Sequence, residues 1–278
     1  MGMTINTNVA SLNAQRNASA NDSSLAISLQ RLSSGLRVNS AKDDAAGLAI
    51  ASRMDAQARG MNVAVRNAND GVSLVQTAES GMAVIGDMFQ RMRELAVQAS
   101  NGTNTTNDLS ALQNEYDALN TEVLRTMNAV QFNGTNLLTT TAAFTFQIGA
   151  NTGQTASIGT ADINITAGVS GISGTAASAL DTTSAAANSA KISALDTAIQ
   201  AINTSRSKVG AIQNRFNYTI SYLQAASENQ QAARGRIMDA DFAVETANLS
   251  RAQILQQAGA AMVAQANQLP QGVLALLR

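Results

Sequence analysis

Residues 61–92 carry the sequence MNVAVRNANDGVSLVQTAESGMAVIGDMFQRM, in which apolar side chains recur at steps of three and four residues. These steps place the side chains along one stripe of an α-helix and are typical of coiled coils and bundles. The stripe extends from about residue 44 to about residue 100. At a rise of 1.5 Å per residue it predicts a rod of about 85 Å, longer than an ordinary globular helix. Its central members are Met61, Val65, Ala68, Val72, Val75, Met82, Ile85, Phe89 and Met92.

A shorter apolar seam precedes this helix. Its members, spaced four, three and four residues apart, are Leu25, Leu29, Leu32 and Leu36. Gly35 indicates a helix stop near the end of this seam, because glycine adopts the left-handed conformation that ends many helices. Ser40 and Asp43 then have the spacing of a capping box, which predicts that they open the long helix.

A third seam follows the long helix. Asn101-Gly102 predicts a turn, and the apolar residues after it are again spaced by three and four. Because the connection is short, this helix is expected to fold back antiparallel along the long one. Asn133-Gly134 predicts another turn at its far end. The seam comprises Leu109, Leu112, Tyr116, Leu119 and Val123.

The segment from about 139 to 188 is rich in Thr, Ser, Gly and Ala and carries the only strand patterns. Phe144, Phe146 and Ile148 alternate with polar or small residues, and Ile163 and Ile165 do so over a shorter stretch. One or two β-hairpins are expected here, flanked by low-complexity chain.

Helical spacing returns from about residue 189. This helix is expected to end near Arg234-Gly235. A final helix should start near Asp239 or Asp241 and run to about Gln268, because Pro270 removes a helical hydrogen bond. The seam of the first of these helices comprises Ile192, Leu195, Ile199, Ile202, Val209, Phe216 and Leu223.

These patterns predict a mainly α fold, in which paired N- and C-terminal segments form a long antiparallel bundle or coiled coil with a small β-hairpin insert. Both ends of the chain have apolar stripes and few charges, which a monomer would hide poorly. Copies of the same chain could bury them, or they could stay disordered until assembly. The candidate assembly residues are Leu25, Leu29, Leu32, Leu36, Ile254, Leu255, Met262, Leu269, Leu274 and Leu277.

The composition argues against catalysis. The chain has no His and no Cys, so it lacks the commonest general base, the commonest metal ligand and any disulfide. Asp43-Asp44 is the only acidic pair that suggests a site, and negative charge at a helix N-terminus explains it more simply. We therefore expect no enzymatic activity and no cofactor or metal.

Net charge and hydropathy also limit which partners and which cellular location can be expected. The net charge of −1 gives no pull toward nucleic acid or an acidic membrane. No run of 18 apolar residues predicts a membrane span, and the C-terminal segment has almost no basic residues to bind lipid. The N-terminus lacks the features of a secretory signal, which taken alone would predict a cytosolic protein.

Several long motifs near both ends, taken together and in this order, resemble bacterial flagellin. They are RLSSGLRVNSAKDDAAG at 31–47, RNANDG at 66–71, QRMRELAVQ at 90–98, SRAQILQQAG at 250–259, AQANQ at 264–268 and VLALLR at 273–278. The resemblance implies an inner core of terminal helices, expected at 1–43 with 236–278. It implies an outer helical core, expected at 44–143 with 186–235. The hairpin and a short variable segment would occupy 144–185, without a large outer domain.

The same resemblance implies a function and partners. A flagellin is exported unfolded through the flagellar type III apparatus without a cleaved signal, so the expected location becomes the extracellular flagellum. It polymerises into the filament used for swimming. Its implied partners are other copies of itself, an export chaperone, the filament cap and the hook-associated proteins.

A surface patch is also implied by the family. Matching positions in flagellins help form the surface that host Toll-like receptor 5 recognises, although subunit packing is the expected primary role of such a patch. Planar donors, a carboxylate and a central apolar residue suit an interface. The patch comprises Gln90, Arg91, Leu95, Gln98 and Glu115.

Three other functions are weighed against a filament subunit. A hook–filament junction protein would share the terminal helices but usually has a more divergent core. A coiled-coil adaptor would stay a discrete oligomer instead of growing. A carboxylate-based hydrolase would need an acid/base pair beyond Asp43-Asp44.

Overall fold

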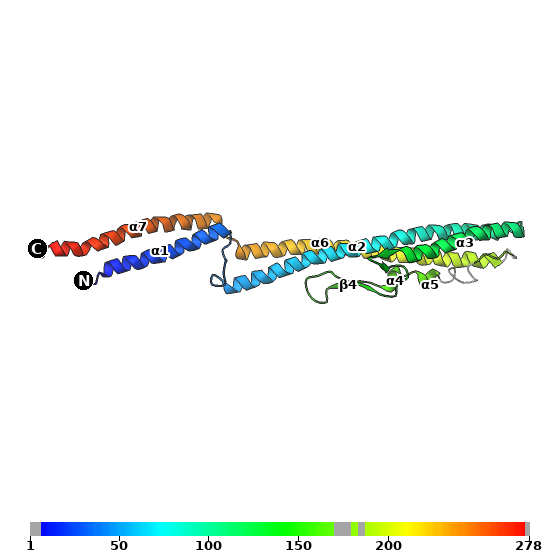
Figure 1. Ribbon diagram of the computed structural model, residues 1–278, viewed down its shortest axis with the longest axis horizontal. Helices are drawn as coiled ribbons and strands as arrows, with labels where there is room; N and C mark the ends of the chain where they lie inside the picture. The colour runs from blue at the N-terminus through cyan, green and yellow to red at the C-terminus, as the bar shows by residue number, and fades with distance from the viewer. Residues whose placement is uncertain (1–6, 170–178, 183–186, 276–278) are drawn as a thin grey trace. The chain divides into compact units, whose positions relative to one another are not determined.

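The computed structural model describes residues 7–169, 179–182 and 187–275. Long helices dominate it, as the spacing of apolar residues predicted (Figure 1). The chain divides into two compact units, which are described separately. Unit 1 is Met1–Ala56 with Asn229–Arg278, and unit 2 is Gln57–Glu228.

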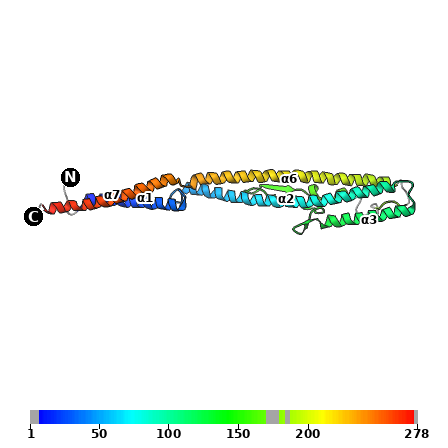
Figure 2. The same cartoon turned by 90° about the horizontal axis from the view of Figure 1, so that it is seen from above.

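Unit 1 contains two terminal helices, α1 (Val9–Ser34) and α7 (Phe242–Ala275), which lie side by side and antiparallel (Figures 1 and 2). Asn8 caps α1 by accepting a hydrogen bond from the Ser11 backbone N–H at 3.1 Å. Gly35 has a φ of 70°, and its N–H donates to the Arg31 carbonyl at 2.8 Å. The predicted glycine stop of the first helix is therefore confirmed.

The links that follow α1 and precede α7 are bonded to each other within unit 1. Leu36 and Asp239 form an isolated antiparallel β-bridge, and the Arg37 N–H donates to the Met238 carbonyl at 2.6 Å. A small buried cluster of Val38, Ala51 and Met238 covers this link. Backbone pairing and apolar burial thus fix the same short region.

The long helix α2 spans Ala45–Ala99, close to the predicted 44–100. Its start differs from the capping box predicted at Ser40 and Asp43. Asp44 is the cap, since its Oδ1 accepts from the Gly47 N–H at 2.8 Å. Asp43 instead accepts from the Asn39 and Ser40 N–H groups in the turn before the helix. Two overlapping capping patterns lie one residue apart, and the second one opens α2.

The core of unit 2 lies between α2, α6 (Asn188–Met238) and the fold-back helix α3 (Thr106–Ala129). Most of the predicted stripe residues are buried there, and both views show α3 running back along α2 (Figures 1 and 2). Thr105 and Asp108 form a capping box at the start of α3. Fully or nearly fully buried members of the core include Met82, Ile85, Phe89 and Met92 from α2, Leu109, Tyr116 and Val123 from α3, and Val209 and Phe216 from α6.

Two hairpins follow α3. The first joins β1 (Gln131–Phe132) to β2 (Thr135–Asn136), and its turn residues Asn133 and Gly134 have φ values of 49° and 77°. Positive φ at both positions marks the tight hairpin turn for which Asn-Gly is preferred. The second pairs β3 (Phe144–Gln147) with β4 (Thr155–Ile158) in antiparallel register.

The strand pattern predicted at Ile163 and Ile165 is wrong. This segment forms two short helical turns, α4 (Thr160–Ile163) and α5 (Thr166–Val169). Asp162 accepts a hydrogen bond from the Gly159 N–H at 2.9 Å, which favours the first turn. Both isoleucines are buried in the core. The spacing of two apolar residues therefore indicated that they are buried, but it did not indicate a strand.

The C-terminal helices are longer than predicted. α6 ends at Met238, a few residues beyond Arg234-Gly235, and α7 continues through Pro270 to Ala275. Proline removes one backbone hydrogen bond, but that loss can be accommodated within a long helix. The prediction that Pro270 ends the helix is therefore wrong.

Candidate assembly and recognition surfaces

The α1–α7 pair exposes its large apolar side chains. The exposed fractions of these residues run from 44% to 66%. They are Val9, Leu12, Ile27 and Leu29 on α1 and Phe242, Val244, Ile254, Leu255 and Met262 on α7. The buried residues of the same pair are small or polar, namely Ser11, Ser28, Glu245, Ala252 and Ala266. The pair therefore leaves many of its large apolar side chains exposed, while its fully buried residues are small or polar, unlike an ordinary two-helix core.

The predicted assembly residues have different environments. Leu29, Ile254, Leu255 and Met262 are exposed, whereas Leu25, Leu32 and Leu36 are half-buried. Leu269 and Leu274 belong to the helical backbone of α7. Leu277 lies outside the described residues.

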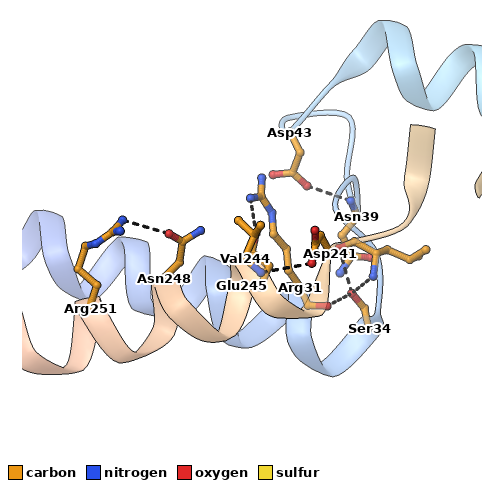
Figure 3. Close-up of polar contacts among 10 residues, drawn as sticks. Arg31, Ser34, Asn39, Asp43, Asp241, Val244, Glu245, Asn248 and Arg251 are labelled. Atoms are coloured by element: carbon orange, nitrogen blue, oxygen red, sulfur yellow. Dashed lines mark hydrogen bonds and ion pairs between the residues drawn. The ribbon is translucent and has the colours of Figure 1, made fainter. Parts of the chain in front are cut away.

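An ion pair joins the two helices near Gly35. The Arg31 Nη1 of α1 donates to the Glu245 Oε1 of α7 at 2.9 Å (Figure 3). This hydrogen bond is the main cause that holds the pKa of Glu245 below its usual value, although burial acts in the opposite direction. Glu245 is therefore ionised at neutral pH, with only 6% of the residue exposed. Its position was missed by the sequence reasoning, although a lone acid in an Ala-rich and Gln-rich segment was a usable signal.

A shallow groove of about 410 Å³ lies beside this ion pair, between α1 and α7. Its lining combines Arg31 and Glu245 with polar and apolar neighbours, among them Ile27, Arg251 and Leu255. Arg251 donates to Asn248 at 3.2 Å within its own helix (Figure 3). The groove adjoins the exposed apolar side chains and belongs to the same surface.

The predicted recognition patch is partly assembled on unit 2. Arg91 of α2 contacts Glu115 of α3, with Nε and Nη2 lying 2.9 and 2.8 Å from Glu115 Oε1, and its Nη1 donates to Glu94 at 2.9 Å. The hydrogen bonds from Arg91 to Glu115 and Glu94 raise the pKa of Arg91. All three side chains are substantially exposed, so the ion pairs organise the surface more than they stabilise the fold.

Leu95 does not lie on this surface. Only 1% of the residue is exposed, and it packs in the core of unit 2. The expectation of Leu95 as the central apolar residue of an exposed patch is therefore corrected. Gln90 and Gln98 are exposed, so the accessible part of the patch is polar and includes the Arg91–Glu115 ion pair.

Asp43 and Asp44 have structural roles in the turn and cap before α2. Among the described residues no group of three or more His, Cys, Asp and Glu side chains could hold a metal ion. No helix within those residues is both long and apolar enough to cross a membrane.

Comparison with known proteins identifies the family. The bacterial flagellin N-terminal helical region matches residues 5–143, and the bacterial flagellin C-terminal helical region matches residues 192–277. The chain belongs to the bacterial flagellin family. As a flagellin it is a structural subunit that self-assembles into the extracellular flagellar filament, and it is not an enzyme.

Relatives of this flagellin match over its whole length. Flagellin of Halalkalibacterium halodurans is 45% identical and flagellin of Bacillus subtilis 42%, each match covering 99% of this chain and 100% of the relative. The flagellar filament 33 kDa core protein of Treponema phagedenis is 42% identical with the same coverage. The crystal structure of Bacillus cereus flagellin is similar with a TM-score of 0.50 and 30% identity, covering 61% of this chain and 94% of that one. These full-length matches favour a filament subunit over the junction protein, the adaptor and the hydrolase.

Proposed function

We propose that this flagellin polymerises through α1 and α7, which bury their outward apolar side chains against neighbouring copies. The observation that carries the proposal is the exposure of large residues such as Leu29, Ile254 and Met262 beside a seam of small and polar ones. A filament gives each copy several identical neighbours, so these residues can be covered on all sides. Unit 1 is thus the polymerising part, and the expected inner-core limits of 1–43 and 236–278 remain a prediction.

The energy available is appropriate for reversible growth. Covering a half-exposed Leu, Ile or Met side chain contributes about 1 kcal/mol. The exposed apolar residues of α1 and α7 together supply several times that amount, and association consumes part of it in lost freedom of motion. Charge offers little opposition, since the described part of α7 carries only Glu245 and Arg251 as charged side chains.

The experiment is sedimentation with negative-stain electron microscopy of the full-length protein and of a version lacking residues 1–40 and 245–278. We expect filaments from the first and soluble monomer from the second. Circular dichroism checks that the shortened chain keeps its helices. A full-length protein that stays a small discrete oligomer, even with filament seeds, would contradict the proposal and favour the junction or adaptor function.

The same terminal helices are proposed to meet the partners that act before and during assembly. An export chaperone, the filament cap and the hook-associated proteins would each cover exposed apolar side chains of α1 or α7. Pull-down of each with full-length protein and with an Ile254→Ser/Met262→Ser variant tests this. Equal capture of both versions would count against it. No nucleic acid or membrane partner is proposed.

We also propose that host Toll-like receptor 5 recognises the free subunit at the Arg91–Glu115 surface. This rests on the family resemblance and on the exposed guanidinium that Glu115 and Glu94 hold in place. The test is receptor binding by monomeric Arg91→Ala and by Arg125→Ala, an exposed arginine paired with Glu122 in the same unit. We expect weaker binding for Arg91→Ala alone. Equal affinities would remove the assignment, whatever the outcome for filament growth.

A further inference from the structure

The buried residues between α1 and α7 do not by themselves determine how the two helices are aligned along their length. These residues are Ser, Ala and one Glu, with no large apolar residue among those described as buried in this pair. On α7, Ala252, Gly259 and Ala266 recur every seven residues, and Ala18 lies opposite Gly259. Small residues repeating at this period would fit almost as well if one helix slid by a heptad. Apolar packing alone therefore specifies the register weakly.

Polar contacts between the helices distinguish one register from the others. The Asn8 side chain donates to the Ala266 carbonyl at 2.7 Å, and the Ser11 hydroxyl lies 2.8 Å from Asn267 Oδ1. Further contacts join Gln256 to Asp22 at 2.9 Å and Arg31 to Glu245 at 2.9 Å. From the first of these contacts to the last, the residue on α1 moves along the chain from Asn8 to Arg31. The residue on α7 moves back from Ala266 to Glu245, by nearly the same number of positions. All four contacts thus belong to one antiparallel alignment.

The Arg31–Glu245 contact discriminates most strongly, because Glu245 is both buried and charged. Its Oε1 is bonded to Arg31, whereas its Oε2 is buried and has no hydrogen-bond partner among the described residues. Sliding α1 by one heptad in one direction would place Ser24 where Arg31 now lies. The carboxylate would then be buried without a cation, an arrangement that proteins strongly avoid. The other three contacts are less costly to lose, because their groups are uncharged or exposed.

We propose that the Arg31–Glu245 ion pair, with its three companion contacts, fixes the register of α1 against α7. It thereby aligns the outward apolar side chains of the two helices into one surface that a second copy can cover. Arg31 and Glu245 act as positioning residues and contribute specificity more than stability. This inference rests on the proposed polymerisation through α1 and α7 and deepens it.

Disulfide trapping can measure the register directly, since the natural chain has no Cys. A Cβ built on Gly259 would lie 3.8 Å from the Ala18 Cβ, a separation that suits a disulfide. Ala18→Cys/Gly259→Cys therefore reports the native register. Ala18→Cys/Ala252→Cys and Ala18→Cys/Ala266→Cys report slides of one heptad in either direction. Filaments are oxidised, then dissociated, and intrachain bonds are quantified by non-reducing electrophoresis and mass spectrometry.

We expect the native pair alone to cross-link in the otherwise natural protein. In a Glu245→Gln background, the two shifted pairs should cross-link about tenfold more, the factor expected from losing one charge-assisted hydrogen bond. The swap Arg31→Glu/Glu245→Arg should restore the native pair and filament growth. Arg251→Gln is the matched control on α7, because its partner Asn248 lies on the same helix, and it should leave the register unchanged.

The outcomes separate the inference from the proposed function. If filaments form but Glu245→Gln keeps only the native cross-link, or the swap fails to rescue it, the ion pair does not set the register. If the full-length protein forms no filaments, polymerisation through α1 and α7 fails. The cross-links can still be measured in the soluble chain, where a native bond that is insensitive to Glu245→Gln would overturn the register inference independently.

Discussion

Gly71 of α2 lies so close to Phe216 of α6 that a Cβ on Gly71 would stand 2.9 Å from the Phe216 Cζ. Phe216 is buried and packs edge-on against Phe146, with ring centroids 5.8 Å apart and an angle of 87° between the planes. The aromatic ring is therefore confined on two sides. A glycine at position 71 is what allows α2 and α6 to approach at this point in unit 2.

Gly71→Ala is predicted to destabilise unit 2 by about 1 kcal/mol or more, because overpacking a core costs about 1–3 kcal/mol and offsets the better helix propensity of alanine. Gly210→Ala is the matched control, since a Cβ added at Gly210 would meet nothing within 4 Å. It should stabilise α6 by up to about 1 kcal/mol. Urea unfolding of monomers followed by circular dichroism measures both, and equal effects would contradict the close approach.

The acid response of the α1–α7 pair should depend on Glu245. Arg31 holds the pKa of Glu245 below its usual value, so the stabilisation is fully present above the usual value, about 4.3. It is lost as the pH falls through the lower pKa of the folded state. The helix content of the assembled protein, followed by circular dichroism, should decline below about pH 4.3. A Glu245→Gln background that declines over the same pH range would argue against this carboxyl group.

Because Tyr116 is buried, unit 2 is predicted to lose stability at alkaline pH. Burial, with a smaller effect of the Asp117 charge, raises the pKa of Tyr116 to about 12 from 10.0. The folded state therefore retains a proton that the unfolded state has lost, and stability falls as the pH rises above 10. The loss should reach about 2–3 kcal/mol near pH 12. Tyr116→Phe should make urea stability nearly flat between pH 10 and 12, and an unchanged slope would refute the assignment.

The start of α2 gives a test of the corrected cap. Asp44→Ala removes the acceptor of the Gly47 N–H and should cost about 1 kcal/mol. Asp44→Asn keeps an acceptor and should cost much less. Thermal unfolding of the two variants compares them under the same conditions. A loss for Asn as large as for Ala would indicate that charge, and not the cap hydrogen bond, matters at this position.

The long helices could be predicted from the sequence because their apolar spacing persists over many turns. The stripe through Met82, Phe89 and Met92 located α2 almost to the residue, and the fold-back of α3 followed from the short turn at Asn101-Gly102. Short patterns were less reliable. Ile163 and Ile165 suggested a strand, although two apolar residues this close are compatible with any buried turn.

The surfaces were harder to predict than the helices. Leu95 follows Met92 by three residues and so continues the buried stripe, a signal that contradicted its expected place in an exposed patch. Glu245 could not be paired with Arg31 from sequence, since 214 residues separate them and only the antiparallel register of α1 and α7 brings them together. The exposure of Ile254 and Met262 likewise depends on which face of α7 meets α1.

The measurement that tests the central claim most directly is the subunit concentration needed for filament growth from seeds. It should be compared for the natural chain, Ile254→Ser/Met262→Ser and the apolar control Ile254→Leu/Met262→Leu. Both positions are exposed in the subunit, so neither variant should alter its fold. We predict that the serine variant requires at least tenfold more protein, the factor equivalent to about 1.4 kcal/mol, while the leucine variant behaves like the natural chain. Equal growth of all three would contradict polymerisation through the apolar face of α7.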